Sequence, residues 1–222
     1  MNSALILAGG RGKRMGSDVS KQFIIVKEKP ILYYTIKKFM DNKNISKIVL
    51  VLPRDEIEYC KKNVIDKYSL KVDYIVEGGK ERQDSVYNGL KVLDETSIVL
   101  IHDGARPFVT DKIIDDGIEY ANRYGSAAPG VTPKDTIKVR NEESFSAETL
   151  RRDILVAIQT PQIFKLDIIK ECHKKVKKEG IIVTDDTMVV EKYGHKVYLY
   201  DGDYKNIKIT TPEDLIIARS MI

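Results

Sequence analysis

The chain has no tryptophan and only two cysteines, Cys60 and Cys172, among its 222 residues. The two thiols lie far apart, and neither has a second cysteine or a histidine at metal-ligand spacing, so neither a disulfide framework nor a zinc site is indicated. A free cysteine is more often a small packing residue than a nucleophile. This cysteine usage is typical of the reducing cytoplasm, which is the localisation that we expect.

Long apolar runs and an excess of charge of one sign are also missing. No apolar run approaches the roughly 20 residues of a membrane-spanning helix, and no charged and then apolar leader is present at the start. There are 37 Lys and Arg against 33 Asp and Glu, a net charge of +4. This balance does not suit a nucleic-acid coat, but it allows a site that gathers cations around a small anion. We therefore expect a soluble protein with neither membrane nor nucleic acid as a partner.

What is present is the composition of an ordinary compact domain. The chain is 42% hydrophobic and 32% charged, and it has no repeat, low-complexity tract or linker. A length of 222 residues lies within what a single core supports. We predict one domain over residues 1–222.

Short apolar runs alternate with amphipathic helical patterns. We expect strands at Asn2–Leu7, Lys47–Leu52, Val72–Val76, Ile98–Ile101 and Ser126–Val131, and helices at Ile31–Met40, Asp55–Tyr68, Arg82–Leu93 and Asp111–Tyr124. Further helices fit Lys165–Glu179, Asp185–Tyr193 and Pro212–Ser220, and a strand fits Lys196–Tyr200. This alternation predicts an α/β fold with a Rossmann-like, mostly parallel sheet flanked by helices.

One segment, residues 132–158, departs from this pattern. Thr136–Val139 alternates, Asn141–Ser146 is a polar turn, and Thr149–Ile158 returns with mixed charge. These features favour an extended β-hairpin inserted into the domain. An insertion of this size is either a lid over an active site or an arm that reaches a partner subunit.

A glycine-rich basic turn, residues 8–16, follows the first strand, with Lys21 shortly after it. Glycines after a buried strand let exposed N–H groups cradle an anion. The turn is not a dinucleotide fingerprint, because Met15 takes the place of the last glycine. It is not a Walker A loop, because Leu7 and Arg14 occupy the first glycine and the hydroxyl positions. The alternative is a tight turn with incidental surface cations.

The turns after the later strands are also polar, and ligands of open α/β sheets collect at the carboxyl ends of the strands. Gly78 and Gly79 expose backbone that can bind a base edge, although Ser85 also fits an ordinary helix start. Asp103 is a candidate magnesium ligand, since Mg²⁺ prefers one or two carboxylates plus phosphate oxygens. For His102 we prefer a structural role.

Two cations remain ambiguous from the sequence. Arg106 suits a structural ion pair and a substrate contact about equally. Lys208 alternates with Ile207 and Ile209 on a predicted short strand, and this spacing favours a solvated face over the site.

Together these segments resemble the 2-C-methyl-D-erythritol 4-phosphate cytidylyltransferases of non-mevalonate isoprenoid synthesis, within the sugar-nucleotidyltransferase superfamily, nearly from end to end. The motifs that carry the resemblance are Gly10 to Met15, Lys21-Gln22-Phe23, Gly78 to Ser85, Asn88-Gly89-Leu90, His102 to Pro107, Thr160-Pro161-Gln162, Thr184-Asp185-Asp186 and Asn206 to Asp214.

The resemblance implies a reaction and a set of roles. The phosphate of methylerythritol phosphate would attack the α-phosphate of CTP and release pyrophosphate. Catalytic cations would be Arg14, Lys21 and Lys208, and Asp103 would hold Mg²⁺. The cytosine pocket would comprise Ala8, Gly9, Gly10, Gly79, Lys80 and Ser85. The second substrate would contact Arg106, Thr136, Arg152, Thr160 and Thr184. By the same resemblance, the arm would swap across a homodimer and bring Thr136 and Arg152 to the neighbouring site.

Two departures from the family pattern leave alternatives. The family usually has Ala-Ala-Gly where this chain has Ala8-Gly9-Gly10, and usually a proline where it has Ser20. The Ala-Gly-Gly form also occurs in ribitol-5-phosphate cytidylyltransferases, so that acceptor is the alternative. A non-catalytic nucleotide-binding homologue is a third possibility, but such a protein would not need transition-state cations.

Overall fold

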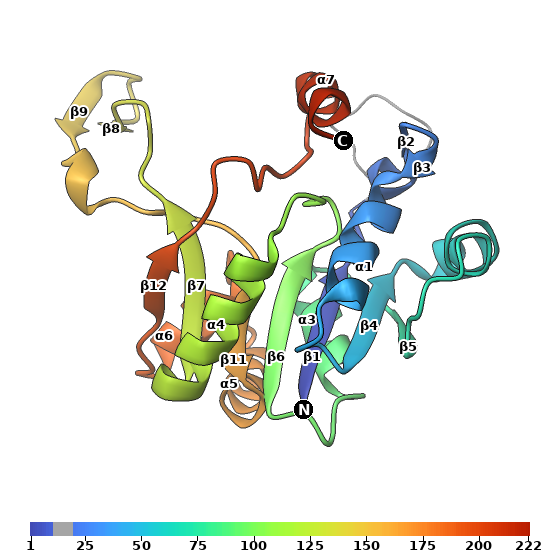
Figure 1. Cartoon of the computed structure of the whole chain (residues 1–222). Coiled ribbons are helices and arrows are strands. Elements are labelled where there is room, and N and C mark those ends of the chain that lie inside the picture. Colours follow the sequence, from blue (N-terminus) through green and yellow to red (C-terminus); the bar gives the residue numbers. More distant parts are fainter. Residues whose placement is uncertain (11–19) are drawn as a thin grey trace.

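The computed structural model describes residues 1–10 and 20–222, and within this part an eight-stranded sheet forms the centre of the molecule (Figure 1). The strand order is β10-β7-β11-β6-β1-β4-β5, with β12 also beside β7. The strands are β1 (Asn2–Leu7), β4 (Lys47–Leu52), β5 (Tyr74–Glu77), β6 (Ile98–Asp103), β7 (Ser126–Val131), β10 (Ala157–Ile158), β11 (Gln162–Lys165) and β12 (Tyr198–Asp201).

The half of the sheet formed by β6, β1, β4 and β5 is parallel. Its central strands are apolar runs because helices cover both faces, as parallel sheets require. The predicted bounds of β1 and β4 are confirmed, whereas β6 continues two residues further and ends on Asp103 itself. The carboxyl ends of β1, β5 and β6 therefore lie at one edge.

The other half contains a strand that the sequence pattern did not predict. β11 runs antiparallel between β6 and β7. Only Ile163 and Phe164 are apolar in it, and two apolar residues are too few to show a strand period. The sheet is therefore mixed but mostly parallel, as expected.

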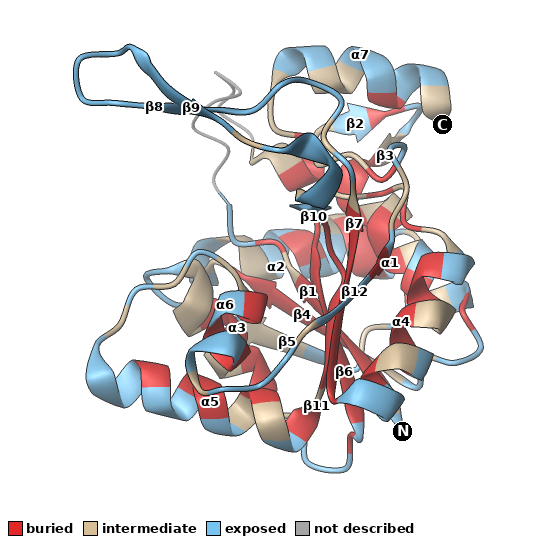
Figure 2. Cartoon of the chain, turned by 90° about the vertical axis from the view of Figure 1, so that its left-hand side faces the viewer, coloured by how far each residue is buried: buried red, intermediate tan, exposed pale blue. Residues whose placement is uncertain are grey.

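Helices cover the two faces of the sheet (Figure 2). The helices are α1 (Ile31–Asp41), α2 (Ile57–Cys60), α3 (Arg82–Leu90), α4 (Asp111–Tyr124), α5 (Leu166–Glu179), α6 (Asp186–Lys192) and α7 (Pro212–Met221). Side chains of β1 alternate between two cores: Ile6 packs in a cluster with α1 and α4, and Leu5 in a cluster with α3 and α5. Cys60 and Cys172 are free and buried, one in each cluster, which confirms that they are packing residues.

Several shorter elements connect the strands and helices of the fold. The predicted helix Asp55–Tyr68 is divided into a 3₁₀ turn (Arg54–Glu56), α2 and a π-helical segment (Lys61–Asp66). A 3₁₀ turn, Lys21–Phe23, precedes a two-stranded ribbon of β2 (Ile25–Val26) and β3 (Lys29–Pro30). The predicted strand at Lys208 is wrong, because residues 206–210 are irregular.

The inserted segment forms a hairpin that projects away from the sheet (Figures 1 and 2). Its strands are β8 (Lys138–Arg140) and β9 (Ser146–Thr149), paired antiparallel, and a 3₁₀ turn at Arg152–Ile154 follows. Nearly all of its residues are exposed, so little holds it against its own domain.

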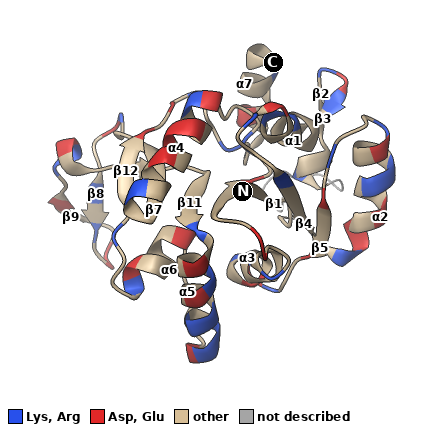
Figure 3. Cartoon of the chain, turned by 60° about the horizontal axis from the view of Figure 1, so that its bottom comes forward, with Lys and Arg blue, Asp and Glu red and all other residues tan. Residues whose placement is uncertain are grey.

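Among the described residues, no helix is long and apolar enough to span a membrane. In Figure 3, the charged residues of α4 are mainly Asp and Glu and those of α5 mainly Lys and Arg, and each helix contains residues of both signs.

Candidate active site

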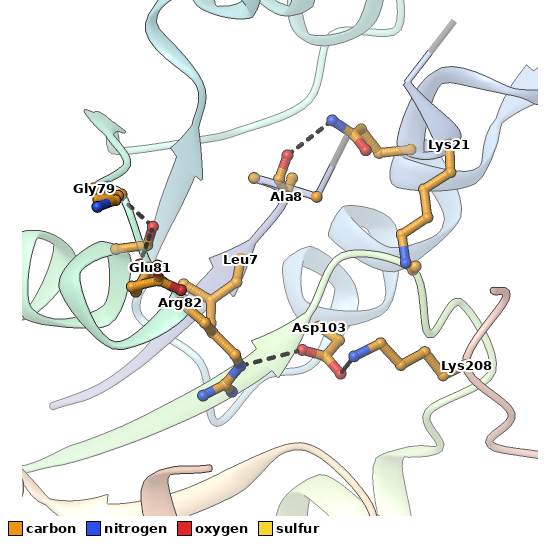
Figure 4. A pocket seen from close by; sticks show the side chains of 14 residues that line it. Leu7, Ala8, Lys21, Gly79, Glu81, Arg82, Asp103 and Lys208 are labelled. Carbon is orange, nitrogen blue, oxygen red and sulfur yellow. Dashed lines mark hydrogen bonds and ion pairs between the residues drawn. The ribbon is translucent and has the colours of Figure 1, made fainter. Parts of the chain in front are cut away.

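A cavity of about 240 Å³ opens at the carboxyl ends of β1, β5 and β6 (Figure 4). It is lined by Leu7, Ala8, Gly9, Gly10, Lys21, Gln22, Gly79, Lys80, Glu81, Arg82, Ser85, Asp103, Ala105 and Lys208. All six residues predicted for the cytosine pocket are among them, together with Lys21, Lys208 and Asp103. Arg14 lies outside the described residues.

The turn after β1 is held in place by a buried glutamine. Gln22 donates from Nε2 to the carbonyl oxygen of Ala8 (2.8 Å) and to Oε2 of Glu56 (2.7 Å). The Ala8 N–H donates to the carbonyl of Val51 on β4 (2.9 Å). Gly9 and Gly10 beyond it are exposed, and Lys21 lies next to Gln22 on the cavity wall. The start of the glycine-rich turn is therefore anchored to the sheet, with Gly9 and Gly10 facing solvent.

The turn between β5 and α3 forms the opposite wall. Ser85 Oγ accepts from the Gly79 N–H (3.0 Å) and donates to the Glu81 carbonyl (3.3 Å), and Glu81 with Asp84 forms a capping box. Ser85 thus shapes the turn in addition to lining the cavity. A Cβ at Gly79 would lie 2.2 Å from Cβ of Asp84, so this position requires glycine.

We expect alanine substitutions at Gly9 and Gly79 to differ in their effect on the stability of the protein. A Cβ at Gly9 meets nothing within 4 Å among the described atoms, so Gly9→Ala is expected to leave stability unchanged. Gly79→Ala must displace the α3 start and is expected to cost about 1–3 kcal/mol, the usual cost of overpacking. Urea unfolding of both variants measures this. Equal midpoints for the two variants would contradict the expectation.

Asp103 lies at the end of β6 and gathers three cations. Lys208 Nζ is 2.8 Å from its Oδ2, Arg106 Nε is 3.7 Å from Oδ2, and Arg82 Nε is 3.8 Å from Oδ1. Burial alone would raise the pKa of Asp103, but the charges of Lys208, Arg82 and Arg106 outweigh it and hold the pKa below its usual range. The carboxylate is ionised at neutral pH. Lys208 faces the cavity, so the solvated orientation that its spacing favoured is wrong.

His102, the residue before Asp103 on β6, contacts Arg106 and Thr160 near the end of the strand. It is fully buried, with Nε2 3.0 Å from the carbonyl oxygen of Arg106 and Nδ1 3.1 Å from Oγ1 of Thr160. Burial lowers the pKa of His102 to about 4, so the ring is neutral. The Asp103 N–H donates to the same Thr160 hydroxyl (3.1 Å). The structural role of His102 is confirmed, and Thr160 shares it.

Arg106 is bound on both sides by the protein. Besides its ion pair with Asp103, it donates from Nη1 to the carbonyl of Asn206 (2.7 Å), and Asn206 donates to the carbonyl of Thr160 (2.9 Å). These bonds join the loop carrying Lys208 to the end of β6. Of the two roles left open for Arg106, the geometry favours the structural ion pair.

The remaining residues predicted for the second substrate do not line the cavity. Thr136 and Arg152 are exposed on the inserted hairpin, where Arg152 donates from Nη1 to the Lys134 carbonyl (2.6 Å). Thr184 is exposed just before α6. The fold of one chain therefore does not bring Thr136 or Arg152 to Asp103.

The sequence pattern alone gives Arg82 and Gln22 no role. Both lie inside motifs that carry the family resemblance, but a polar residue at a helix start or in a short turn has no spacing that separates it from a surface residue. Arg82 lines the cavity and is drawn pointing toward Asp103 from the side opposite Lys208 (Figure 4).

Comparisons with known proteins agree over the whole chain. A family model described as 2-C-methyl-D-erythritol 4-phosphate cytidylyltransferase matches residues 3–222. A protein of that name from Clostridium beijerinckii is 62% identical over 222 residues, which cover 100% of this chain and 98% of that protein. One from Clostridium perfringens is 61% identical over 219 residues, covering 99% and 97%.

A solved structure is similar in fold as well as in sequence. The 4-diphosphocytidyl-2C-methyl-D-erythritol synthase of Anaerococcus prevotii superposes with a TM-score of 0.87 at 33% identity, covering 100% of this chain and 95% of that one. The 2-C-methyl-D-erythritol 4-phosphate cytidylyltransferase of Thermus thermophilus gives a TM-score of 0.78 at 26% identity, covering 98% and 96%.

Proposed function

Since the chain belongs to the 2-C-methyl-D-erythritol 4-phosphate cytidylyltransferase family, we propose that the cleft at the ends of β1, β5 and β6 is its active site. The protein is a nucleotidyltransferase that transfers CMP from CTP to 2-C-methyl-D-erythritol 4-phosphate in isoprenoid biosynthesis. The observation that carries the site is the cavity, in which the glycine-rich turn, the Gly79 turn, Lys21, Lys208 and Asp103 converge from distant parts of the sequence.

We propose that CTP lies between the two turns. The backbone of residues 8–10 and 79–80 would bind the cytosine edge, with Ser85 holding the second turn in shape. Carbonyl acceptors there would take the exocyclic amine that uracil lacks, and a mismatched donor discriminates strongly because it leaves buried groups unpaired.

The reaction needs positioned charge rather than a covalent intermediate. A phosphate oxygen of the acceptor forms a bond to the α-phosphorus, while the bond from that phosphorus to the bridging β-phosphate oxygen breaks and its electron pair leaves with pyrophosphate. Lys21 and Lys208 line the cavity, and with Arg14 they would stabilise the negative charge on the α-phosphate. Lys208 is already oriented by its 2.8 Å ion pair with Asp103.

The donors of the cleft fit a magnesium ion. Among the described residues, no group of three or more His, Cys, Asp or Glu side chains could form a metal cage. Mg²⁺ does not need one, because it is commonly held by one or two carboxylates, substrate phosphates and water. Asp103, ionised and lining the cavity, would hold the ion, which would neutralise triphosphate charge.

The activity test offers two acceptors in parallel. Pyrophosphate release is measured with CTP and Mg²⁺, with 2-C-methyl-D-erythritol 4-phosphate or ribitol 5-phosphate. Turnover with the first is the expected result, since the curated relatives at about 60% identity carry that acceptor in their names. Preference for ribitol 5-phosphate would change the acceptor, and inactivity with both would favour the non-catalytic alternative.

We also propose that the protein is a homodimer in which the arm, residues 132–158, completes the partner's site. Arg152 and Thr136 are exposed on the arm and outside the cavity of their own chain. The arm also exposes apolar side chains, including Phe145 and Ile154, each 68% exposed, which a partner subunit would cover.

Subunit mixing tests the arm exchange. Arg152→Ala and Lys21→Ala chains, each inactive as homodimers, are expected to recover activity in heterodimers, because one of the two sites then has both residues intact. Co-expression with two different affinity tags isolates the heterodimer for assay. A tagged heterodimer that shows no recovery would contradict exchange.

The cytoplasm is the compartment that we propose. Cys60 and Cys172 are free and buried in separate cores, so no disulfide depends on an oxidising environment. Burial raises the pKa of the Cys60 thiol to about 12, which keeps it unreactive.

A further inference from the structure

Next to the cavity, three polar side chains from three different helices contact one another in a row. Arg82 lies in the first turn of α3, Asp186 in the first turn of α6, and His173 in the middle of α5. Arg82 Nη1 is 2.7 Å from Oδ2 of Asp186, and His173 Nε2 is 3.1 Å from Oδ1 of the same carboxylate. The Asp186 and His173 side chains are each 1% exposed, whereas that of Arg82 is 33% exposed and lines the cavity.

The position of Asp186 is fixed by the sheet. Gln162 on β11 accepts at Oε1 from the N–H groups of Asp186 (3.0 Å) and Thr187 (3.2 Å), and its Nε2 donates to Asp185 Oδ2 (2.9 Å). Asp185 in turn caps α6 by accepting from the Met188 N–H (2.9 Å). The carboxylate of Asp186 is therefore held rigidly behind Arg82.

Arg82 and Asp186 carry opposite charges. Burial alone would raise the pKa of Asp186, but the Arg82 charge and the His173 contact outweigh it and lower the pKa, so the carboxylate is ionised. Arg82 thus has two acidic neighbours, with Asp186 close at 2.7 Å and Asp103 distant at 3.8 Å. Without Asp186, the guanidinium would be drawn to Asp103, because Arg pairs most favourably with a carboxylate through two parallel hydrogen bonds.

We propose that Asp186 and His173 are positioning residues of the transferase reaction, which hold the Arg82 guanidinium at the cleft wall for a phosphate oxygen of bound substrate, in closer contact with Asp186 than with Asp103. The planar fork of N–H donors on Arg82 suits a phosphate. His173 donates a hydrogen bond from Nε2 to Asp186, and this bond fixes the direction of that carboxylate. The inference deepens the proposed function and rests on it, since it concerns the same cleft.

Two conservative substitutions separate positioning from packing at His173. The amide nitrogen of glutamine can replace Nε2 of histidine, whereas that of asparagine reaches only the Nδ1 position. His173→Asn is therefore expected to lower kcat about 10-fold, because small misplacements of a reacting-site group are costly. His173→Gln is expected to keep most of the activity. Thermal unfolding of each variant shows what fraction is folded at the assay temperature.

Repeating these changes in an Arg82→Met background decides whether they act through Arg82. If they do, Arg82→Met lowers turnover by itself, and His173→Asn lowers it no further. Asp186→Asn gives a second, volume-conserving measurement with the same expected pattern. An equal fall in both backgrounds would indicate a scaffold role and overturn the inference, as would a wild-type kcat together with wild-type KM values in Arg82→Met.

The same assays distinguish this inference from the proposed function. A wild-type protein inactive with CTP and either acceptor would overturn both. An active wild type that is indifferent to Arg82→Met would overturn the positioning inference alone. A rise in KM for CTP or for the acceptor in Arg82→Met supports the inference and identifies which phosphate Arg82 contacts.

Discussion

Lys21→Ala is expected to lower kcat about 100- to 1,000-fold, the usual loss when one stabilising charge is removed from a transition state. Lys21 lines the cavity and sits beside Gln22, whose bond to the Ala8 carbonyl anchors the glycine-rich turn. Its charge matters most when the α-phosphorus becomes five-coordinate, so the affinity for CTP should change much less than kcat. Steady-state kinetics and calorimetric titration with CTP measure the two quantities separately.

An exposed lysine serves as the control for this variant. Lys38 on α1 is exposed and does not line the cavity, so Lys38→Ala removes the same charge elsewhere and should leave kcat unchanged. A Lys21→Ala enzyme with wild-type kcat would remove Lys21 from the catalytic set. A proportionate loss of CTP binding would instead make it a ground-state contact.

Asp103→Asn is expected to reduce kcat by at least about 100-fold, because the variant removes the carboxylate that orients Lys208 and would hold Mg²⁺. It should also destabilise the protein. The charges of Lys208, Arg82 and Arg106 all converge on this carboxylate. Removing one partner of a buried ion pair typically costs about 3–5 kcal/mol.

The pH dependence of stability gives Asp103→Asn a second readout. The folded-state pKa of Asp103 lies below the ordinary value of 3.8, so its contribution to stability is present above that pH and is lost as the pH falls further. The variant should lose stability at pH 7 and should have a shallower acid-unfolding profile than the wild type. Urea unfolding at several pH values measures both effects.

Asp94→Asn is the matched control for Asp103→Asn. Its side chain is 83% exposed and forms a surface ion pair with Lys170 at 3.3 Å, a pair of little energetic consequence. Kinetics and stability should stay close to wild type. If Asp103→Asn were as active as this control, neither the metal role nor the orienting role of Asp103 would stand.

The parallel half of the fold was predictable because its signals are local. β1 and β4 are apolar runs of six residues, and α4 has both its N-cap Thr110 and its C-terminal Gly125 in the sequence. β11 was missed because its four residues are too few to show an alternating apolar pattern. It is a strand because it pairs with β6 and β7 on its two sides. Lys208 was misplaced because the alternation around it suggested a strand, whereas the loop is held by Asn206 and the ion pair with Asp103.

The sequence by itself determined the class of the protein: an α/β domain with a glycine-rich turn after its first strand, polar turns after the later ones, and motifs whose order identifies the family. These follow from period, turn chemistry and motif, which act over a few neighbouring residues. Only the tertiary structure decided how each polar side chain is used. Arg106 joins two loops, Lys208 faces the cavity, and Arg82 is paired with Asp186, which His173 contacts from a third helix. The energy of a charge depends on the distance and burial of its partners, and here those partners lie up to about a hundred positions away along the chain.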